Sequence, residues 1–187
     1  LKAGIQYADA VTTVSPSYAR EICTEEFAYG FAGIMRATRE QGRLYGILNG
    51  IDTRHWNPAT DPYLHENYDL GSGHVAGKKR NKLALLQQLG AIDPVAAAEL
   101  PLLGFIGRLV TQKGIDLILQ VLPSLLQQGR VNLVCVGSGE SHFEQALRQL
   151  ALDYPHNTFV HIGYSEALAH QVEAGSDLFL MPSRFEP

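Results

Sequence analysis

The stretch from Gly104 to Asp116 reads Gly-Phe-Ile-Gly-Arg-Leu-Val-Thr-Gln-Lys-Gly-Ile-Asp and governs how the second half of the chain is interpreted. The apolar run 102–106 predicts a buried strand, and a helix with apolar periodicity is predicted to follow the stretch. Two cations, Arg108 and Lys113, lie on the loop between them. Open α/β sheets bind ligands at the carboxyl ends of their strands, and a helix N-terminus adds unpaired N–H groups there. The guanidinium of Arg108 and the ammonium of Lys113 could together bind a pyrophosphate. The simpler alternative is that both side chains are solvated and bind no ligand.

The composition is typical of a globular protein. The chain has 187 residues, 45% of them hydrophobic and 18% charged, which is enough for a full core. A net charge of −4 gives no electrostatic reason to expect nucleic acid, and no apolar run approaches the ~20 residues that span a bilayer. We therefore expect neither a nucleic-acid nor a membrane partner. The chain begins without Met and stops just after a strand-like run, so we also expect it to be part of a longer protein.

The cysteines and histidines suggest no covalent or metal framework. Cys135 lies in the apolar run 131–136, where a thiol behaves as a small core residue, and Cys23 lies in a different setting. We expect no disulfide and a reducing cytoplasm. None of the seven histidines has another His or Cys at metal-ligand spacing in the sequence, so we expect surface or packing roles for them.

Turn-rich sequence divides the chain near Asn49. Before it we expect the end of a helix at 1–8 and a short strand at 10–14. A helix capped by Ser15 is expected from residue 15 onward, and a second strand at 44–48. From Asn49-Gly50 to Gly77 the apolar periodicity is low. This region is the best candidate for a domain boundary or hinge, and a plain surface connection fits the composition equally well.

Beyond the boundary, the basic run 77–82 leads into an apolar helix, so we expect it to form a solvated first turn. The segment 91–99 contains Pro94 and is predicted to be a loop. Pro123 is expected to kink or split the helix that begins after Gly114. The spacing of Ser141 and Glu144 predicts a capping box.

From residue 102 the predicted order is strand, helix, strand, helix, strand, helix, strand. The strands are expected at 102–106, 131–136, 158–162 and 177–181. Because such crossovers are right-handed, the strands are predicted to be parallel with helices on both faces, an α/β Rossmann-like fold. Every loop of interest then follows a strand, and all of these loops share one edge of the sheet.

Glycines and a tyrosine lie on two of these loops. Gly137, Ser138 and Gly139 would let the backbone approach a ligand closely, and a tight turn explains them nearly as well. They do not complete a dinucleotide fingerprint, because His142 stands where a third glycine is required. Tyr164 can stack on a nucleobase, and an ordinary rim tyrosine is the alternative.

The chemistry that fits this edge is displacement of a nucleoside diphosphate. Negative charge grows on the leaving phosphate, and cations fixed beside it lower the barrier. No Asp-x-Asp pair occurs in the chain, so Arg108 and Lys113 would act without a metal or other cofactor. Glu186 can bind ribose or sugar hydroxyls, or it can pair with Arg184.

With these residues in place, the chain resembles bacterial glycogen synthases and plant starch synthases over nearly its whole length. The motifs that carry the resemblance are Tyr7-Ala8-Asp9, Thr13-Val14-Ser15-Pro16, Leu48-Asn49-Gly50-Ile51-Asp52, Trp56-Asn57-Pro58, Gly107-Arg108-Leu109, Gln112-Lys113-Gly114, Gly137-Ser138-Gly139, Ile162-Gly163-Tyr164 and Pro182-Ser183-Arg184-Phe185-Glu186-Pro187.

The resemblance implies a retaining glycosyltransferase of the GT-B type, with two facing Rossmann-like domains, that transfers glucose from ADP-glucose to the non-reducing end of an α-1,4-glucan. Residues 1–49 would be the tail of the acceptor-side domain with the hinge, and 50–187 most of the donor domain. Arg108 and Lys113 would bind the donor phosphates and Tyr164 the adenine. Glu186 would contact the donor sugar, and Asn49 would lie at the hinge beside the active site. The location would be the bacterial cytoplasm, or the plastid for a plant protein.

Parts of the family pattern are missing, and rival functions stay open. The Lys-Thr-Gly-Gly-Leu loop and the acceptor-domain Asp and His are absent, and the last motif stops before its Cys-Gly-Leu continuation. We therefore expect no transferase activity from this piece alone and weak ADP binding at best. The alternatives are another GT-B nucleotide-sugar transferase such as a sucrose or trehalose-type synthase, a non-catalytic nucleotide-binding module, and an NAD dehydrogenase.

Overall fold

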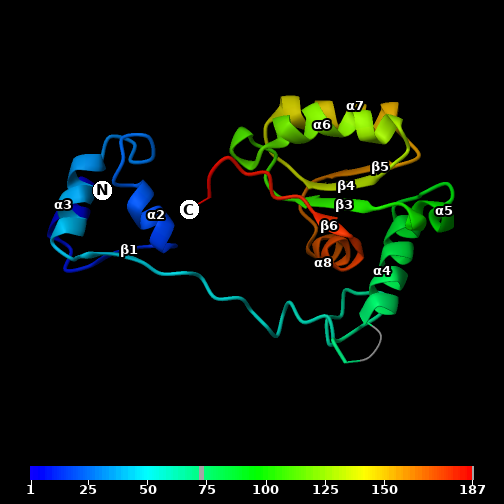
Figure 1. Ribbon diagram of the computed structural model, residues 1–187, viewed down its shortest axis with the longest axis horizontal. Helices are drawn as coiled ribbons and strands as arrows, with labels where there is room; N and C mark the ends of the chain where they lie inside the picture. Colours follow the sequence, from blue (N-terminus) through cyan, green and yellow to red (C-terminus); the bar gives the residue numbers. More distant parts are fainter. Residues whose placement is uncertain (72–73, 187) are drawn as a thin grey trace. The chain divides into compact units, whose positions relative to one another are not determined.

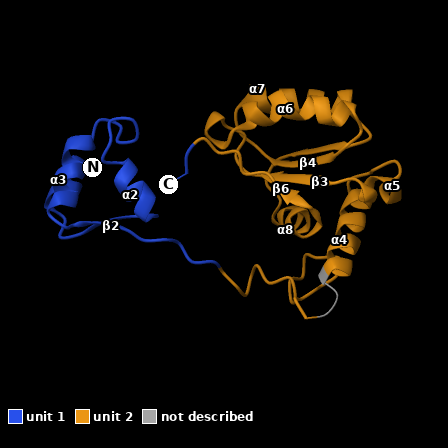
Figure 2. Cartoon of the chain, in the orientation of Figure 1, with its two compact units in different colours: residues 1–51, 185–187 blue, residues 52–184 orange. Residues whose placement is uncertain are grey.

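The computed structural model describes residues 1–71 and 74–186, and these form two compact units. The first holds residues 1–51 together with Phe185 and Glu186, and the second holds residues 52–184 (Figure 2). The division follows Ile51, close to the predicted boundary at Asn49. Pro187, the last residue of the C-terminal motif, lies outside the described residues. The assignment of the first unit to an acceptor-side domain stays a prediction.

The first unit contains a two-stranded parallel sheet and three helices. The elements are α1 (Lys2–Tyr7), β1 (Val11–Thr13), α2 (Pro16–Glu21), α3 (Ala32–Glu40) and β2 (Leu44–Gly46). β1 and β2 pair with Val11 opposite Leu44. The predicted cap is confirmed, because Ser15 Oγ accepts a hydrogen bond from the Tyr18 N–H at 2.9 Å.

The second unit is built on a four-stranded parallel sheet in the order β5-β4-β3-β6 (Figure 1). Its elements are α4 (His74–Gln88), α5 (Pro94–Glu99), β3 (Leu102–Ile106), the 3₁₀ turn η1 (Thr111–Lys113), α6 (Ile115–Gln127), β4 (Asn132–Gly137), α7 (Ser141–Asp153), β5 (Thr158–Ile162), α8 (Glu166–Gly175) and β6 (Leu178–Phe179). The predicted alternation from residue 102 onward and the parallel sheet are confirmed.

Alternating side chains of the central strands form two separate cores. Leu103 and Phe105 of β3 and Cys135 of β4 pack with α6 and α7, whereas Leu102 and Val134 pack with α4 and α8. Figure 1 shows these helix pairs on opposite faces of the sheet. Central parallel strands are apolar on both sides for this reason. Burial raises the pKa of the Cys135 thiol to about 12, and both cysteines are free and buried.

The prediction that residues 91–99 form a loop is wrong, because α5 occupies most of that segment. Asp93 Oδ1 accepts a hydrogen bond from the Ala96 N–H at 3.0 Å, and Pro94 stands at the first helical position. An Asp-Pro pair is a helix-start signal, since proline lacks an N–H that the first turn would leave unpaired anyway.

Two helix details also differ from expectation. α6 continues through Pro123 without being split, so of the two expected effects of this proline only the kink stays a prediction. α7 has Glu140 as its N-cap and no side-chain capping bond, so Ser141 does not cap it, although Glu144 Oε1 does accept from the Gly139 N–H at 3.0 Å.

Among the described residues, no helix is long and apolar enough to cross a membrane.

The basic run is not the solvated first turn that its composition predicts. Lys82 is buried, and its Nζ donates to Asp177 Oδ2 and to the Leu100 carbonyl, both at 2.6 Å. Lys78 Nζ donates to the Ala174 carbonyl at the end of α8, and burial lowers the pKa of Lys78. Both lysines therefore attach α4 to the rest of the unit.

Replacing Lys82 by Met tests this attachment. The substitution removes the cation beside Asp177 and leaves the Leu100 carbonyl without its donor, so we expect a loss of about 2 kcal/mol in the free energy of unfolding. Urea denaturation measures it. Lys79→Met is the matched control, because Lys79 is exposed on the same helix; an equal effect of the two substitutions would contradict the buried role of Lys82.

Candidate functional site

The loops that follow β3, β4 and β5 are hydrogen-bonded to one another at one edge of the sheet. The Leu109 N–H donates to the Ser138 carbonyl at 2.9 Å, and the Glu140 N–H donates back to the Leu109 carbonyl at 2.8 Å. On the other side of β4, the Gly163 N–H donates to the Gly137 carbonyl at 2.9 Å. Strand pairing thus continues past the strand ends and fixes the relative positions of the three loops.

A hollow of about 250 Å³ opens on these loops. Among its lining residues are Arg108 from the first loop, Gly137 and Ser138 from the second, and Tyr164 from the third. Tyr164 is 86% exposed, so its ring is accessible for stacking and is not part of the core. The fold therefore brings together residues from three separate loops that were predicted to act together.

A larger hollow, of about 510 Å³, lies at the opposite edge, where β4 and β5 begin. It is lined by loop and helix ends that include Asp93, Asn132 and Asn157, and none of the predicted site residues lines it. Size alone would favour this hollow over the one at Arg108, and a third hollow of about 620 Å³, lined by Lys79, Arg80 and Lys82 among others, is larger still but also lies where strands begin, beside Pro101 and Asp177. We favour the hollow at Arg108 because it lies at the carboxyl ends of the strands and contains a cation, whereas the one at Asn132 is lined by neither lysine nor arginine.

Arg108 is the cation placed directly at the hollow. It is exposed, its Nη2 donates to Gln112 Oε1 at 3.2 Å, and no carboxylate among the described residues pairs with it. Most of its N–H groups are therefore available to an anion. Lys113 is half-buried on η1, immediately before Gly114 and α6, and it is not among the residues that line the hollow.

Gly137 and Gly139 are required by the packing of the loops. A Cβ atom on Gly137 would lie 1.9 Å from the Gly107 carbonyl oxygen, and one on Gly139 would lie 2.3 Å from the Leu109 carbonyl oxygen. Neither distance is tolerable, because both neighbours are backbone atoms and cannot move aside as the end of a flexible side chain can. The tight-turn explanation of these glycines is therefore sufficient, and contact of their backbone with a ligand stays a prediction.

The segment after β6 is attached to the same edge. The Arg184 N–H donates to the Gln112 carbonyl at 2.8 Å, and the Arg184 guanidinium forms an ion pair with Asp116 in the first turn of α6. A Cβ atom on Gly114, whose φ is 72°, would lie 2.2 Å from the Pro182 carbonyl oxygen. Arg184 is thus held by Asp116, and the two alternatives for Glu186, binding sugar hydroxyls or pairing with Arg184, both stay predictions.

Two predicted residues belong to the first unit. Glu186 follows Phe185, whose ring lies 6.2 Å from that of Phe27, and Asn49 is exposed near the end of that unit. Their roles at the active site stay predictions.

Sequence reasoning placed Gln112 in a family motif but assigned it no role. Its side-chain oxygen accepts from Arg108 and its carbonyl accepts from Arg184, so one residue orients two of the motifs. This role was not predictable from the sequence, because a neutral glutamine on a loop between two cations carries no signal of its own.

The chain is similar in sequence to known glycosyltransferases. Residues 1–37 match the family model described as the starch synthase catalytic domain, and residues 100–187 match that of glycosyl transferases group 1. The chain is similar to the glycogen and starch synthases. It is 56% identical to the glycogen synthase of Hydrogenovibrio crunogenus and 54% identical to that of Cellvibrio japonicus, each over the whole chain. It spans only 38% and 37% of the length of those two relatives.

Solved structures show the same fold. The catalytic domain of starch synthase IV from Arabidopsis thaliana, bound to ADP and acarbose, superposes on the chain with a TM-score of 0.87 and 38% identity. That match covers 100% of the chain and 37% of the synthase. Anabaena HepE in complex with UDP is 17% identical with a TM-score of 0.60, covering 97% of the chain and 40% of HepE, and it supports the fold alone. The α/β parallel-sheet unit is therefore that of the GT-B glycosyltransferases, as the sequence resemblance implied.

Gly137→Ala tests whether the rim loops depend on close backbone packing. Because the new methyl group would overlap the Gly107 carbonyl, we expect a loss of about 1–3 kcal/mol in stability, measured by thermal or urea unfolding. Gly107→Ala on the same rim is the control, since its Cβ would make only ordinary contacts, at 3.4 Å or more, with the ring of Phe105. If both variants are as stable as the wild type, the loops are not packed as described.

Proposed function

We propose that the protein of which this chain is part is a retaining glucosyltransferase of the glycogen and starch synthase type. It transfers glucose from ADP-glucose to the non-reducing end of an α-1,4-glucan, and we place it in the bacterial cytoplasm. The observation that carries the proposal is the hollow at the strand ends, where Arg108, the Gly137-Ser138 turn and Tyr164 meet. The likeness to a starch synthase domain that binds ADP and acarbose supports the choice of donor and acceptor.

Arg108 and Lys113 bind the two phosphates of the donor in this proposal. Arg108 offers a planar set of N–H donors with no competing carboxylate among the described residues, and Lys113 precedes the N-terminus of α6. An arginine fork matches phosphate oxygens in pairs, and a helix N-terminus favours negative charge. The two side chains and the helix therefore act on one anion from adjacent positions of the same loop.

The bond between the sugar and the phosphate breaks as negative charge builds up on the leaving ADP. Groups that are already oriented toward that charge lower the barrier without reorganising during the reaction. Gln112 supplies such orientation, because its side chain accepts from Arg108 while its carbonyl accepts from the Arg184 N–H. We propose that no metal takes part at this step, since the chain lacks an Asp-x-Asp pair.

The remaining site residues take the roles that the family resemblance implies. Tyr164 stacks on the adenine, which its 86% exposure permits. Glu186 contacts the donor sugar, and Asn49 lies at the hinge on the acceptor side. Stacking discriminates weakly between bases, so the preference for ADP over UDP rests on the relatives and not on Tyr164.

Arg108→Ala and Lys113→Ala test the phosphate role in the full-length parent. We expect each to lower kcat by roughly 10²–10³, because one group that stabilises the developing charge contributes about 3–4 kcal/mol. Steady-state kinetics with ADP-glucose and a glucan primer measure the loss. Arg130→Ala, which removes an exposed arginine just before β4 at the other edge of the sheet, should leave kcat unchanged. ADP binding with no effect of either substitution on transfer would favour a non-catalytic nucleotide-binding module.

The 187-residue chain alone is expected to have no transferase activity. It spans less than two fifths of its glycogen synthase relatives, and the family motifs expected on the acceptor side are absent from its sequence. Incorporation of labelled glucose from ADP-glucose into glycogen is the measurement, with the full-length parent as the positive control. Turnover by the isolated chain would refute this expectation.

Tighter binding of NADH than of ADP would instead indicate a dehydrogenase-like site.

A further inference from the structure

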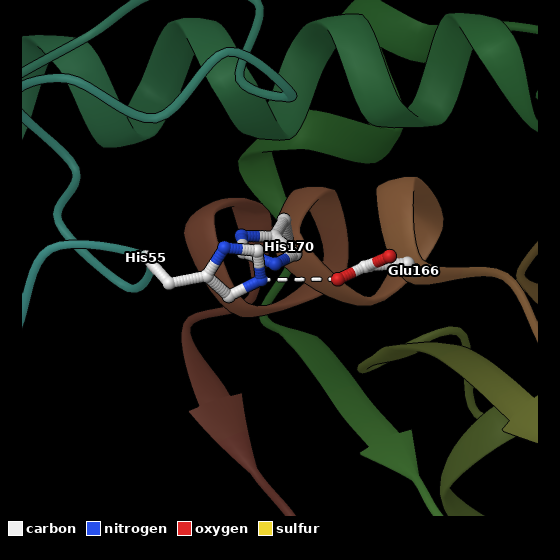
Figure 3. Close-up of side chains that lie close together, drawn as sticks. All are labelled: His55, Glu166 and His170. Carbon is white, nitrogen blue, oxygen red and sulfur yellow. Dashed lines mark hydrogen bonds and ion pairs between the residues drawn. The ribbon is translucent and has the colours of Figure 1, made fainter. Parts of the chain in front are cut away.

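Two histidines and a glutamate that are distant in sequence meet at the surface of the second unit (Figure 3). Glu166 and His170 lie one turn apart on α8, and His55 comes from the loop that follows the first unit. Each of the three side chains offers one ligand atom, and all three atoms lie within 4.8 Å of one another. His55 Nε2 is already 3.0 Å from Glu166 Oε1. Sequence spacing could not reveal this cluster, because His55 and Glu166 are 111 residues apart.

One ring nitrogen of His170 contacts Asp61, and the other has no hydrogen-bond partner in the described structure. Its side chain is fully buried, and Nδ1 lies 2.6 Å from Asp61 Oδ2. Nε2 is buried and has no hydrogen-bond partner in the described structure. If both nitrogens carried protons, Nε2–H would be a buried donor without an acceptor, which native structures rarely contain. A neutral ring that donates Nδ1–H to Asp61 instead leaves the Nε2 lone pair available to a ligand.

The surroundings hold these side chains in position. The ring of Trp56 stacks on His170, with centroids 3.7 Å apart and an interplanar angle of 3°, and it meets His55 edge-on at 5.5 Å. Asp52 Oδ1 accepts from the N–H groups of Arg54 and His55, at 2.9 and 3.0 Å, and fixes the turn that presents His55. These backbone hydrogen bonds also lower the pKa of Asp52.

We propose that His55, Glu166 and His170 bind a divalent transition-metal ion, with Zn²⁺ as the best fit, and that Asp61 orients His170 from behind. Two imidazoles and one carboxylate form a ligand set that Zn²⁺ accepts, with a fourth position left for water. A carboxylate on the second nitrogen of a metal-binding histidine is the usual supporting contact. This site is separate from the one proposed for the donor phosphates.

The geometry requires only a small adjustment. Zn–N and Zn–O distances of roughly 2.0–2.2 Å place tetrahedral ligand atoms about 3.4 Å apart. His55 Nε2 and Glu166 Oε1 are 3.0 Å apart, slightly closer than that spacing, and their side chains are 42% and 45% exposed, so they can separate a little and close on an ion beside the fixed His170. A bound ion would tie the loop around His55 to α8, whose N-cap Ser165 follows Tyr164 directly.

The chain contains its own reporter for such a site. Trp56 is the single tryptophan, and it contacts both proposed histidine ligands. In the untagged 187-residue chain, Co²⁺ should therefore quench tryptophan fluorescence, and Zn²⁺ should compete with Co²⁺ and restore it. Calorimetry with Zn²⁺ should give a single equivalent per chain, and Zn²⁺ should raise the Tm.

The variants that decide the proposal are His55→Ala and Glu166→Gln, because both residues are partly exposed and circular dichroism can verify that each variant folds. We expect each to weaken Zn²⁺ binding about tenfold or more, and Asp61→Asn to weaken it by roughly 10–100-fold through His170. His142→Ala is the matched control, since His142 also lies beside a carboxylate, 3.7 Å from Glu140, and outside the cluster. Binding that is absent in the wild type, or equal in His55→Ala, Glu166→Gln and His142→Ala, would overturn the proposal.

Discussion

Parallel pairing of β3, β4 and β5 is the constraint on which the rest of the second unit depends. Parallel strands all point the same way, so whatever follows each of them emerges at one edge of the sheet. In this protein the pairing continues beyond the strands, through the hydrogen bonds of Leu109 with Ser138 and Glu140 and of Gly163 with Gly137. The loops that carry Arg108, Ser138 and Tyr164 therefore share one rigid frame.

Close backbone approach makes that frame possible and explains several sequence features together. Glycine stands at 137 and 139 because neighbouring carbonyl oxygens occupy the space of a side chain, and at 114 because Pro182 does so. Gln112 and Asp116 then attach the segment around Arg184 to the start of α6. Charged groups act most strongly on a transition state when their positions are set beforehand, and here neutral backbone contacts set them.

Local patterns predicted most of this fold. Apolar runs of five or six residues between glycine-rich turns gave the strands, and the alternation of elements was enough for the parallel sheet and its functional edge. Tertiary contacts account for what was missed. Lys82 was predicted to be solvated because it belongs to a basic run. Its ammonium instead pairs with the carboxylate of Asp177, 95 residues later in the chain. α5 was missed for a different reason, since Pro94 was interpreted as a loop residue and not as the first residue of a helix.

The candidate site was predictable to a similar degree. Strand-end position brought Arg108, Gly137, Ser138 and Tyr164 to one hollow, as expected, because topology alone decides which loops meet. The meeting of His55 with Glu166 and His170 had no counterpart in the sequence, since an irregular loop carries no periodicity from which its path can be inferred. Such loops are positioned by particular contacts, here the stacking of Trp56 on His170.

In the proposed function, Arg108 and Lys113 recognise a diphosphate without a metal. Calorimetry of the full-length parent with ADP and with AMP, both in EDTA, is the decisive measurement. We expect ADP to bind about tenfold more tightly than AMP or better, because a charged hydrogen bond contributes roughly 1.5–3 kcal/mol, and we expect Arg108→Ala to abolish this advantage. Equal affinities for the two nucleotides, or a preference for ADP that appears only when Mg²⁺ is added, would contradict it.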